Sequence, residues 1–267
     1  MFKVVKILVT LVLLSSSAWG GERYVLLQST TSTQNSGLYE YLLPIFTAQT
    51  GIEVRVVAVG TGQAIRNSSN GDADVLLVHA KSAEEAFVAS GNGVKRFDLM
   101  YNDFVIIGHE SDPLGLSDMA DLGAALTMLA QGDATFVSRG DDSGTHKMEQ
   151  KLWEVVGQAP APSAWYRETG AGMGATLRMA VEMLGYALTD RATWISYADK
   201  SDMRIVFEDA DALLNQYGII AVNPARHPHV NAFAAGIFIA WMLGAQGQAL
   251  IGAYTLDGQQ LFYPNAE

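Results

Sequence analysis

The sequence predicts an α/β protein of two lobes joined by two crossing strands. Short apolar strands alternate with amphipathic helices along the 267 residues, a pattern typical of a parallel sheet covered by helices. At four places a strand runs into a stretch of Ser, Thr and Gly that opens a helix, two early and two in the middle of the chain. Two apolar segments, 97–108 and 217–224, lie on either side of the two polar stretches in the middle of the chain. We expect them to cross between the lobes, with 102–108 and 218–222 as the hinge.

The first 20 residues predict a secretory signal peptide. Lys3 and Lys6 precede an apolar run over 7–14, and Ala18-Trp19-Gly20 is a small-x-small cleavage signal. That run is much shorter than the ~20 residues that a membrane span needs. Because the chain contains no Cys, we expect neither a lipoprotein anchor nor a disulfide. We expect a periplasmic protein that begins near Gly21 and does not insert into the membrane after cleavage.

The acidic composition excludes several classes of partner. The chain has 28 acidic and 17 basic residues, and removal of the two lysines of the signal peptide changes the net charge from −11 to −13. Nucleic acids and anionic membranes need basic surface, so neither is an expected partner. Net charge says little about one dehydrated pocket, so an anionic ligand stays possible. We expect a monomer without a cofactor, with lobe I formed by 21–104 and 218–267 and lobe II by 105–217.

The four polar stretches predict an anion site. They are 29–33 (followed by Ser36-Gly37), 60–62, 138–145 and 169–174. The carboxyl ends of parallel strands meet at one edge of a sheet, where ligands bind. Helix starts there offer unpaired N–H groups and a positive dipole end, hydroxyls add donors, and Gly lets the backbone come close. One such stretch alone is more often ordinary helix capping. Four together favour an oxyanion site.

Nine residues of the first three stretches are the predicted ligand contacts: Thr30, Thr31, Ser32, Thr61, Gly62, Arg139, Ser143, Gly144 and Thr145. Only Arg139 brings a full positive charge, and its planar guanidinium can donate two parallel hydrogen bonds to the ligand. The neighbouring acids Asp141 and Asp142 are out of place beside an anion. We expect one of them to pair with Arg139 and the other to cap the following helix.

Several segments resemble the tungstate-binding component of bacterial tungstate ABC transporters. The resemblance covers essentially the whole chain after the signal peptide. Ser29 stands where that family has Thr, and because a hydroxyl is kept we expect binding to be kept. The segments are Ser29-Thr30-Thr31-Ser32-Thr33-Gln34-Asn35-Ser36-Gly37-Leu38, Tyr101-Asn102-Asp103-Phe104, Leu188-Thr189-Asp190-Arg191, and Asn223-Pro224 leading to His227-Pro228-His229-Val230-Asn231.

This resemblance implies the clamshell fold of periplasmic binding proteins, a membrane permease as partner, and no enzymatic activity. It also implies that the oxyanion is held by hydrogen bonds alone, with no bond between metal and protein. A tungstate dianion has four acceptor oxygens and no proton at neutral pH. The site should therefore consist almost entirely of donors.

Two alternatives stay open at this point. The segment Arg139-Gly140-Asp141-Asp142-Ser143-Gly144-Thr145 also resembles the Arg-x-Asp-x-Ser-Gly-Thr loop of phosphate-binding proteins, so molybdate, vanadate or phosphate could be the ligand. Phosphate carries a proton and would need an acceptor, such as Asp141 or Asp142 facing inward. The other alternative is a two-lobed hydrolase with Ser143 as nucleophile. The chain has no Gly-x-Ser-x-Gly elbow, and His146 lies too close in the same helix for triad geometry.

Overall fold

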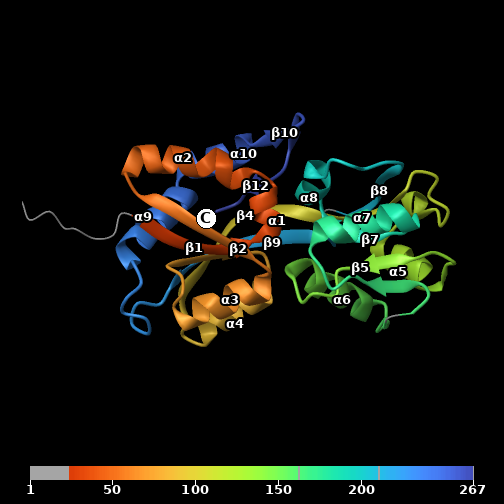
Figure 1. Cartoon of the computed structure of the whole chain (residues 1–267), viewed down its shortest axis with the longest axis horizontal. Helices are drawn as coiled ribbons and strands as arrows, with labels where there is room; N and C mark the ends of the chain where they lie inside the picture. The colour runs from red at the N-terminus through yellow and green to blue at the C-terminus, as the bar shows by residue number, and fades with distance from the viewer. Residues whose placement is uncertain (1–23, 162, 210, 267) are drawn as a thin grey trace, which may run out of the picture.

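The computed structural model describes residues 24–161, 163–209 and 211–266, so the predicted signal peptide lies outside the described residues. Figure 1 shows an elongated molecule whose two halves are joined by long strands. The strands are β1 (Tyr24–Thr30), β2 (Glu53–Val59), β3 (Val75–Val78), β4 (Gly93–His109), β5 (Phe136–Ser138), β6 (Tyr166–Glu168), β7 (Ala187–Asp190), β8 (Met203–Glu208), β9 (Leu214–Val222), β10 (Thr255–Leu256), β11 (Gln259–Gln260) and β12 (Tyr263–Pro264). The helices are α1 (Thr31–Asn35), α2 (Leu38–Thr50), α3 (Thr61–Asn70), α4 (Lys81–Ala89), η1 (Leu116–Asp118), α5 (Leu122–Gln131), α6 (Gly144–Val155), α7 (Met173–Met183), α8 (Arg191–Ser196), α9 (Ala232–Leu243) and α10 (Ala245–Ala253).

The sheet of the first lobe has the order β12-β4-β9-β3-β1-β2. Strands β2 and β3 run parallel to β1, whereas β9 is antiparallel to both β3 and β4. The expected parallel arrangement is therefore found for β1, β2 and β3 but is wrong where β9 pairs with β3 and β4. Because β9 enters this sheet on its return from the second lobe, it runs against its neighbours.

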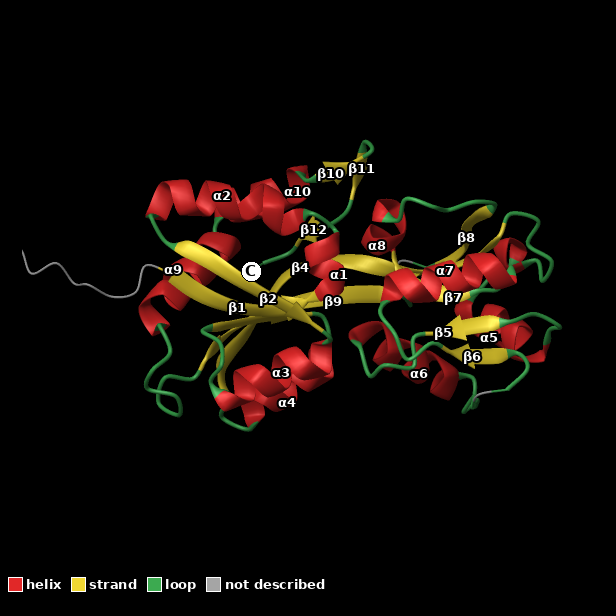
Figure 2. Ribbon diagram, in the orientation of Figure 1, coloured by secondary structure: helices red, strands yellow, loops and turns green. Residues whose placement is uncertain are grey.

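Helices cover both faces of this sheet, as Figure 2 shows, with α2, α9 and α10 on one side and α3 and α4 on the other. On the first side Phe46 of α2 meets Phe238 of α9 edge to face, with the ring centroids 5.1 Å apart. On the other side Phe87 packs with Leu76 and Ile220 of the sheet. Both faces of the central strands are thus buried, which explains why β3 is apolar at all four positions.

The second lobe is built on the far half of β4. Strands β7 and β8 pair antiparallel with it, and β5 pairs parallel with β6. Its core contains Trp153 and Phe136 in edge-to-face contact at 5.2 Å. Helix α8 bridges the lobes, since Ala192 and Ile195 are buried in the first lobe's core although the adjoining strand β7 belongs to the second.

The lobes are joined where β4 and β9 run side by side. Asn102 pairs with Asn215, beyond which β4 turns to its partners in the second lobe. Leu213 is buried in the second lobe's core and Tyr217 in the first. Strand β9 therefore crosses at Leu214–Gln216, a few residues before the expected hinge segment, because residues 218–221 already pair with β3.

Among the residues that the structure describes, no single helix is long and apolar enough to cross a membrane. Helices α9 and α10 are long and apolar enough for a membrane span only when they are taken together, and a bend of 59° separates them.

Candidate anion-binding site

A small cavity lies where the two lobes meet, lined by hydroxyls, glycines, one arginine and one histidine. The amide N–H of Gly144, in the second lobe, donates to Thr61 Oγ1 of the first lobe at 3.1 Å, so the lobes touch directly at this point. Of the nine predicted contacts, all but Gly62 line the cavity. The lining residues are Thr30, Thr31, Ser32, Val59, Gly60, Thr61, His79, Arg139, Ser143, Gly144 and Thr145.

The first polar stretch forms the end of β1 and the short helix α1 rather than a loop. Thr30 is the N-cap of α1, and its Oγ1 accepts from the Thr33 amide at 3.4 Å. Thr30 Oγ1 also lies 3.1 Å from Ser32 Oγ, so the hydroxyls at the cavity are cross-bonded and held in place. Ser29 does not line the cavity. Its hydroxyl bonds to Tyr39 Oη at 2.5 Å and donates to the carbonyl of Leu77 at 2.8 Å, an anchoring role.

The second stretch places Thr61 at the first position of α3. The leading N–H groups of a helix have no partner within it, so the end of α3 adds donors and a positive dipole end to the cavity. Gly62 lies one residue further along. A methyl group there would stand 2.9 Å from Asp142 Oδ2, which puts Gly62 against the opposite lobe rather than in the cavity lining.

Arg139 is almost fully buried, with 5% of its surface exposed, and is paired with Asp141. Its Nε and Nη2 donate to Asp141 Oδ2 at 3.2 and 2.5 Å, as expected for one of the two acids. Burial alone would raise the pKa of Asp141, but hydrogen bonds from Arg139 and Ser143 lower it below its usual value. Because one edge of the guanidinium is held by Asp141, the ligand can use only Nη1 and the remaining Nη2 hydrogen.

The expectation that the other acid caps α6 is wrong. Asp142 has a φ of +58°, and its side chain points outward to an ion pair with Lys147. Ser143 has the extended backbone of an N-cap, and its Oγ accepts from the His146 amide at 3.2 Å. The Ser143 side chain also hydrogen-bonds to Asp141, which helps to lower the pKa of that carboxyl.

His79 belongs to the cavity and was missed by the sequence analysis. It follows β3 directly, with Nε2 3.3 Å from Ser32 Oγ and Nδ1 3.0 Å from Asn215 Oδ1. Its ring stacks on Tyr217 with the centroids 4.8 Å apart. Burial lowers the pKa of His79, against the opposing field of Asp190. The expectation of a site made almost entirely of donors is therefore incomplete, because a neutral imidazole also offers one acceptor.

The fourth polar stretch, 169–174, does not line the cavity but supports Arg139, which does. Thr169 Oγ1 donates to the carbonyl of Arg139 at 3.1 Å, which fixes the backbone that carries the guanidinium. On the other side Ser138 Oγ donates to the buried carboxylate of Glu149 at 2.8 Å and accepts from the Gly140 amide at 3.2 Å. These bonds hold the Arg139 turn rigid.

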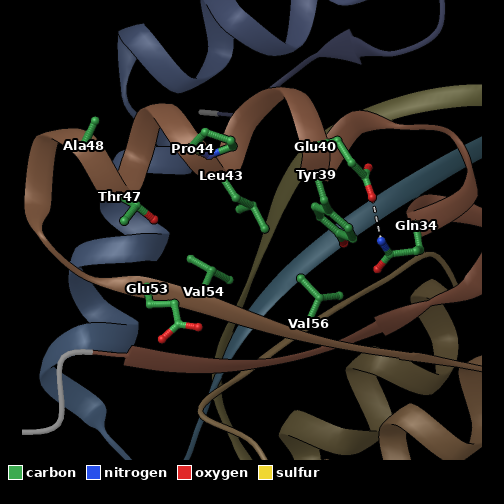
Figure 3. Close-up of a pocket in the computed structure, with 10 residues that line it drawn as sticks. All are labelled: Gln34, Tyr39, Glu40, Leu43, Pro44, Thr47, Ala48, Glu53, Val54 and Val56. Atoms are coloured by element: carbon green, nitrogen blue, oxygen red, sulfur yellow. Dashed lines mark hydrogen bonds between the residues drawn. The ribbon is translucent and has the colours of Figure 1, made fainter.

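A wider groove between α2 and β2 has a different character. Figure 3 shows it lined by apolar side chains such as Leu43 and Val56, with Gln34 donating to Glu40 at one end at 2.7 Å. Glu53 stands at the rim. Its apolar floor offers an anion no donors and the carboxylates at its edge repel one, so this groove does not suit an oxyanion.

A two-lobed α/β fold with a polar cavity between the lobes defines a solute-binding protein, and residues 15–246 match the PBP superfamily domain. The tungstate-binding protein TupA of Peptoclostridium acidaminophilum is 48% identical over 91% of this chain and 86% of its own length. The structure of TupA from Desulfovibrio alaskensis G20 is 48% identical, with a TM-score of 0.81 over 91% of this chain and 99% of that one. The tungstate ABC transporter structure from Geobacter sulfurreducens is 46% identical, with a TM-score of 0.80 over 86% of this chain and 98% of that one.

The chain therefore belongs to the TupA family of tungstate-binding proteins within the PBP superfamily.

Proposed function

We propose that this protein captures tungstate in the periplasm and delivers it to the membrane permease of an ABC importer. The observation that carries the proposal is the convergence of donors from both lobes on one cavity around the buried cation Arg139. Its relatives of 46–48% identity are named for tungstate binding or tungstate transport. The periplasmic location and the permease partner rest on those names and on the predicted signal peptide.

The proposed ligand contacts are hydroxyls and backbone amides of Thr30, Thr31, Ser32 and Thr61 from lobe I, and of Ser143, Gly144 and Thr145 with the Arg139 guanidinium from lobe II. The proposed division is the expected one, 21–104 and 218–267 for lobe I and 105–217 for lobe II, except that Tyr217, which is buried in the first core, belongs to lobe I. The protein acts as a monomer. A charge-assisted hydrogen bond contributes ~1.5–3 kcal/mol. About eight such bonds outweigh an association cost of ~4–15 kcal/mol. Tight capture is thus possible with Arg139 as the one permanent positive charge among the proposed contacts.

The site supports binding rather than catalysis. Ser143 Oγ accepts from the His146 amide, whereas the His146 ring accepts from the Asp142 amide at its Nδ1, 3.1 Å away. That imidazole does not face the hydroxyl as a general base must. His146 therefore cannot act as the general base that the hydrolase alternative needs.

We expect the order of affinity to be tungstate, molybdate, sulfate and then phosphate. Sulfate is smaller than tungstate, so it leaves stretched hydrogen bonds in a cavity shaped for the larger ion. Phosphate is also small and carries a proton at pH 7.5. Both oxygens of the Asp141 carboxylate are engaged by Arg139 and Ser143, and His79 Nε2 is engaged by the Ser32 hydroxyl, so neither residue offers the proton a ready acceptor. Competition calorimetry measures the order, and displacement of tungstate by an equal concentration of phosphate would favour a phosphate receptor instead.

A further inference from the structure

A chain of hydrogen bonds leads from the cavity into the crossing strands. Ser32 Oγ lies 3.3 Å from His79 Nε2, His79 Nδ1 lies 3.0 Å from Asn215 Oδ1, and Asn215 Nδ2 donates to Asn102 Oδ1 at 2.7 Å. All four side chains are at least nine-tenths buried. Asn102 and Asn215 face each other where β4 and β9 pass between the lobes.

This chain sets the hydrogen of the His79 ring. In the structure the Asn215 amide nitrogen faces Asn102 and its oxygen faces His79 Nδ1, so that ring nitrogen is the donor in this arrangement. In a neutral ring Nε2 then carries no hydrogen, and its lone pair, which is directed at the cavity, accepts from the Ser32 hydroxyl. An oxyanion oxygen placed beside that lone pair would be repelled, and Ser32 would be kept from donating to the ligand.

A protonated ring removes both problems, because Nε2–H becomes a donor and the imidazolium adds a positive charge. The charged groups that bear on His79 are Asp190, which favours the proton, and Arg139, which opposes it. Arg139 is itself paired with Asp141. Without an anion in the cavity, burial is the largest influence and lowers the pKa of His79.

Resting on the tungstate function proposed above, we propose that His79 takes up one proton from solvent when a fully deprotonated oxyanion binds and becomes a second cationic donor to it. The oxyanion keeps all its oxygens unprotonated, and the Nδ1–H bond to Asn215 is retained. Binding and protonation then favour each other. A neutral His79 must gain a proton for the complex to form, so affinity falls as pH rises between the pKa of the free state and that of the complex.

Titration calorimetry of the wild-type protein with sodium tungstate at pH 7.5, in buffers of different ionisation enthalpy, counts the protons exchanged. We expect uptake of close to one proton, and an affinity that falls by up to about tenfold per pH unit above neutrality. Tungstate binding with no proton exchange would overturn the role of His79 and leave the proposed function standing. Absence of any binding would instead overturn the proposed function.

The variant His79→Gln assigns the proton to this ring. Glutamine can accept from Ser32 or donate to the ligand but does not titrate, so the uptake and the pH dependence of affinity should vanish. His109→Gln is the matched control, because His109 lies at the far end of β4 and bonds to Ser111 Oγ at 2.7 Å. It should keep the wild-type uptake. Continued uptake by His79→Gln would assign the proton to another group and overturn the proposal.

Discussion

Replacement of Arg139 by alanine should weaken tungstate binding by roughly 100-fold or more, since two charge-assisted hydrogen bonds of ~1.5–3 kcal/mol each are lost. The loss is increased because Asp141 would remain as an unpaired carboxylate next to the dianion. Arg139→Lys should recover only part of the affinity. An ammonium supplies a point charge but cannot hold Asp141 through two nitrogens and still donate to the ligand.

Isothermal titration calorimetry measures both variants. Arg178→Ala is the control, because Arg178 is an exposed arginine on α7 of the same lobe and does not line the cavity. It should bind like the wild type. Wild-type affinity in Arg139→Ala would show that Arg139 does not bind the ligand.

The second large effect is expected for Gly144→Val. A Cβ at Gly144 would lie 3.0 Å from His79 Cε1 and 3.0 Å from Thr61 Oγ1, both of which belong to the opposite lobe. The clash therefore arises only when the lobes close, and the second lobe itself should fold normally. Overpacking typically costs ~1–3 kcal/mol, so the affinity should fall roughly 5- to 150-fold.

Small-angle X-ray scattering reports the closure directly. The radius of gyration of the wild type should decrease on addition of tungstate, and that of Gly144→Val should decrease less. Gly174→Val is the matched control, since a Cβ at Gly174 meets nothing within 4 Å. An unchanged radius in the wild type would show that binding does not need lobe closure.

Most of the fold could be predicted because burial leaves a clear pattern in the sequence. The crossing strands β4 and β9 are long apolar segments outside the repeating strand and helix units, and they were predicted from that property. Strand direction could not be predicted, since a strand buried on both faces has the same apolar composition in either direction. Helix α1 was expected as a loop because Ser, Thr and Asn favour turns. In the structure Thr30 caps it.

The ligand-binding stretches could be predicted where the end of a strand is followed at once by Ser, Thr or Gly. No such stretch surrounds His79, and its place in the cavity depends on Asn215, 136 residues further along the chain. Its position after β3 was the one usable indication, because β3 is parallel to β1 and ends at the same edge of the sheet. The different roles of Asp141 and Asp142 follow from the left-handed backbone at Asp142, which local composition does not reveal.

Native mass spectrometry tests the central claim most directly, because tungsten identifies itself by its mass. The protein is incubated with sodium tungstate in the presence of a large excess of phosphate and sulfate, and the intact complex is then weighed. We expect one tungstate per chain and neither competitor bound. A chain that carries phosphate or sulfate instead, or that carries no tungsten, would contradict the assignment of the cavity to tungstate.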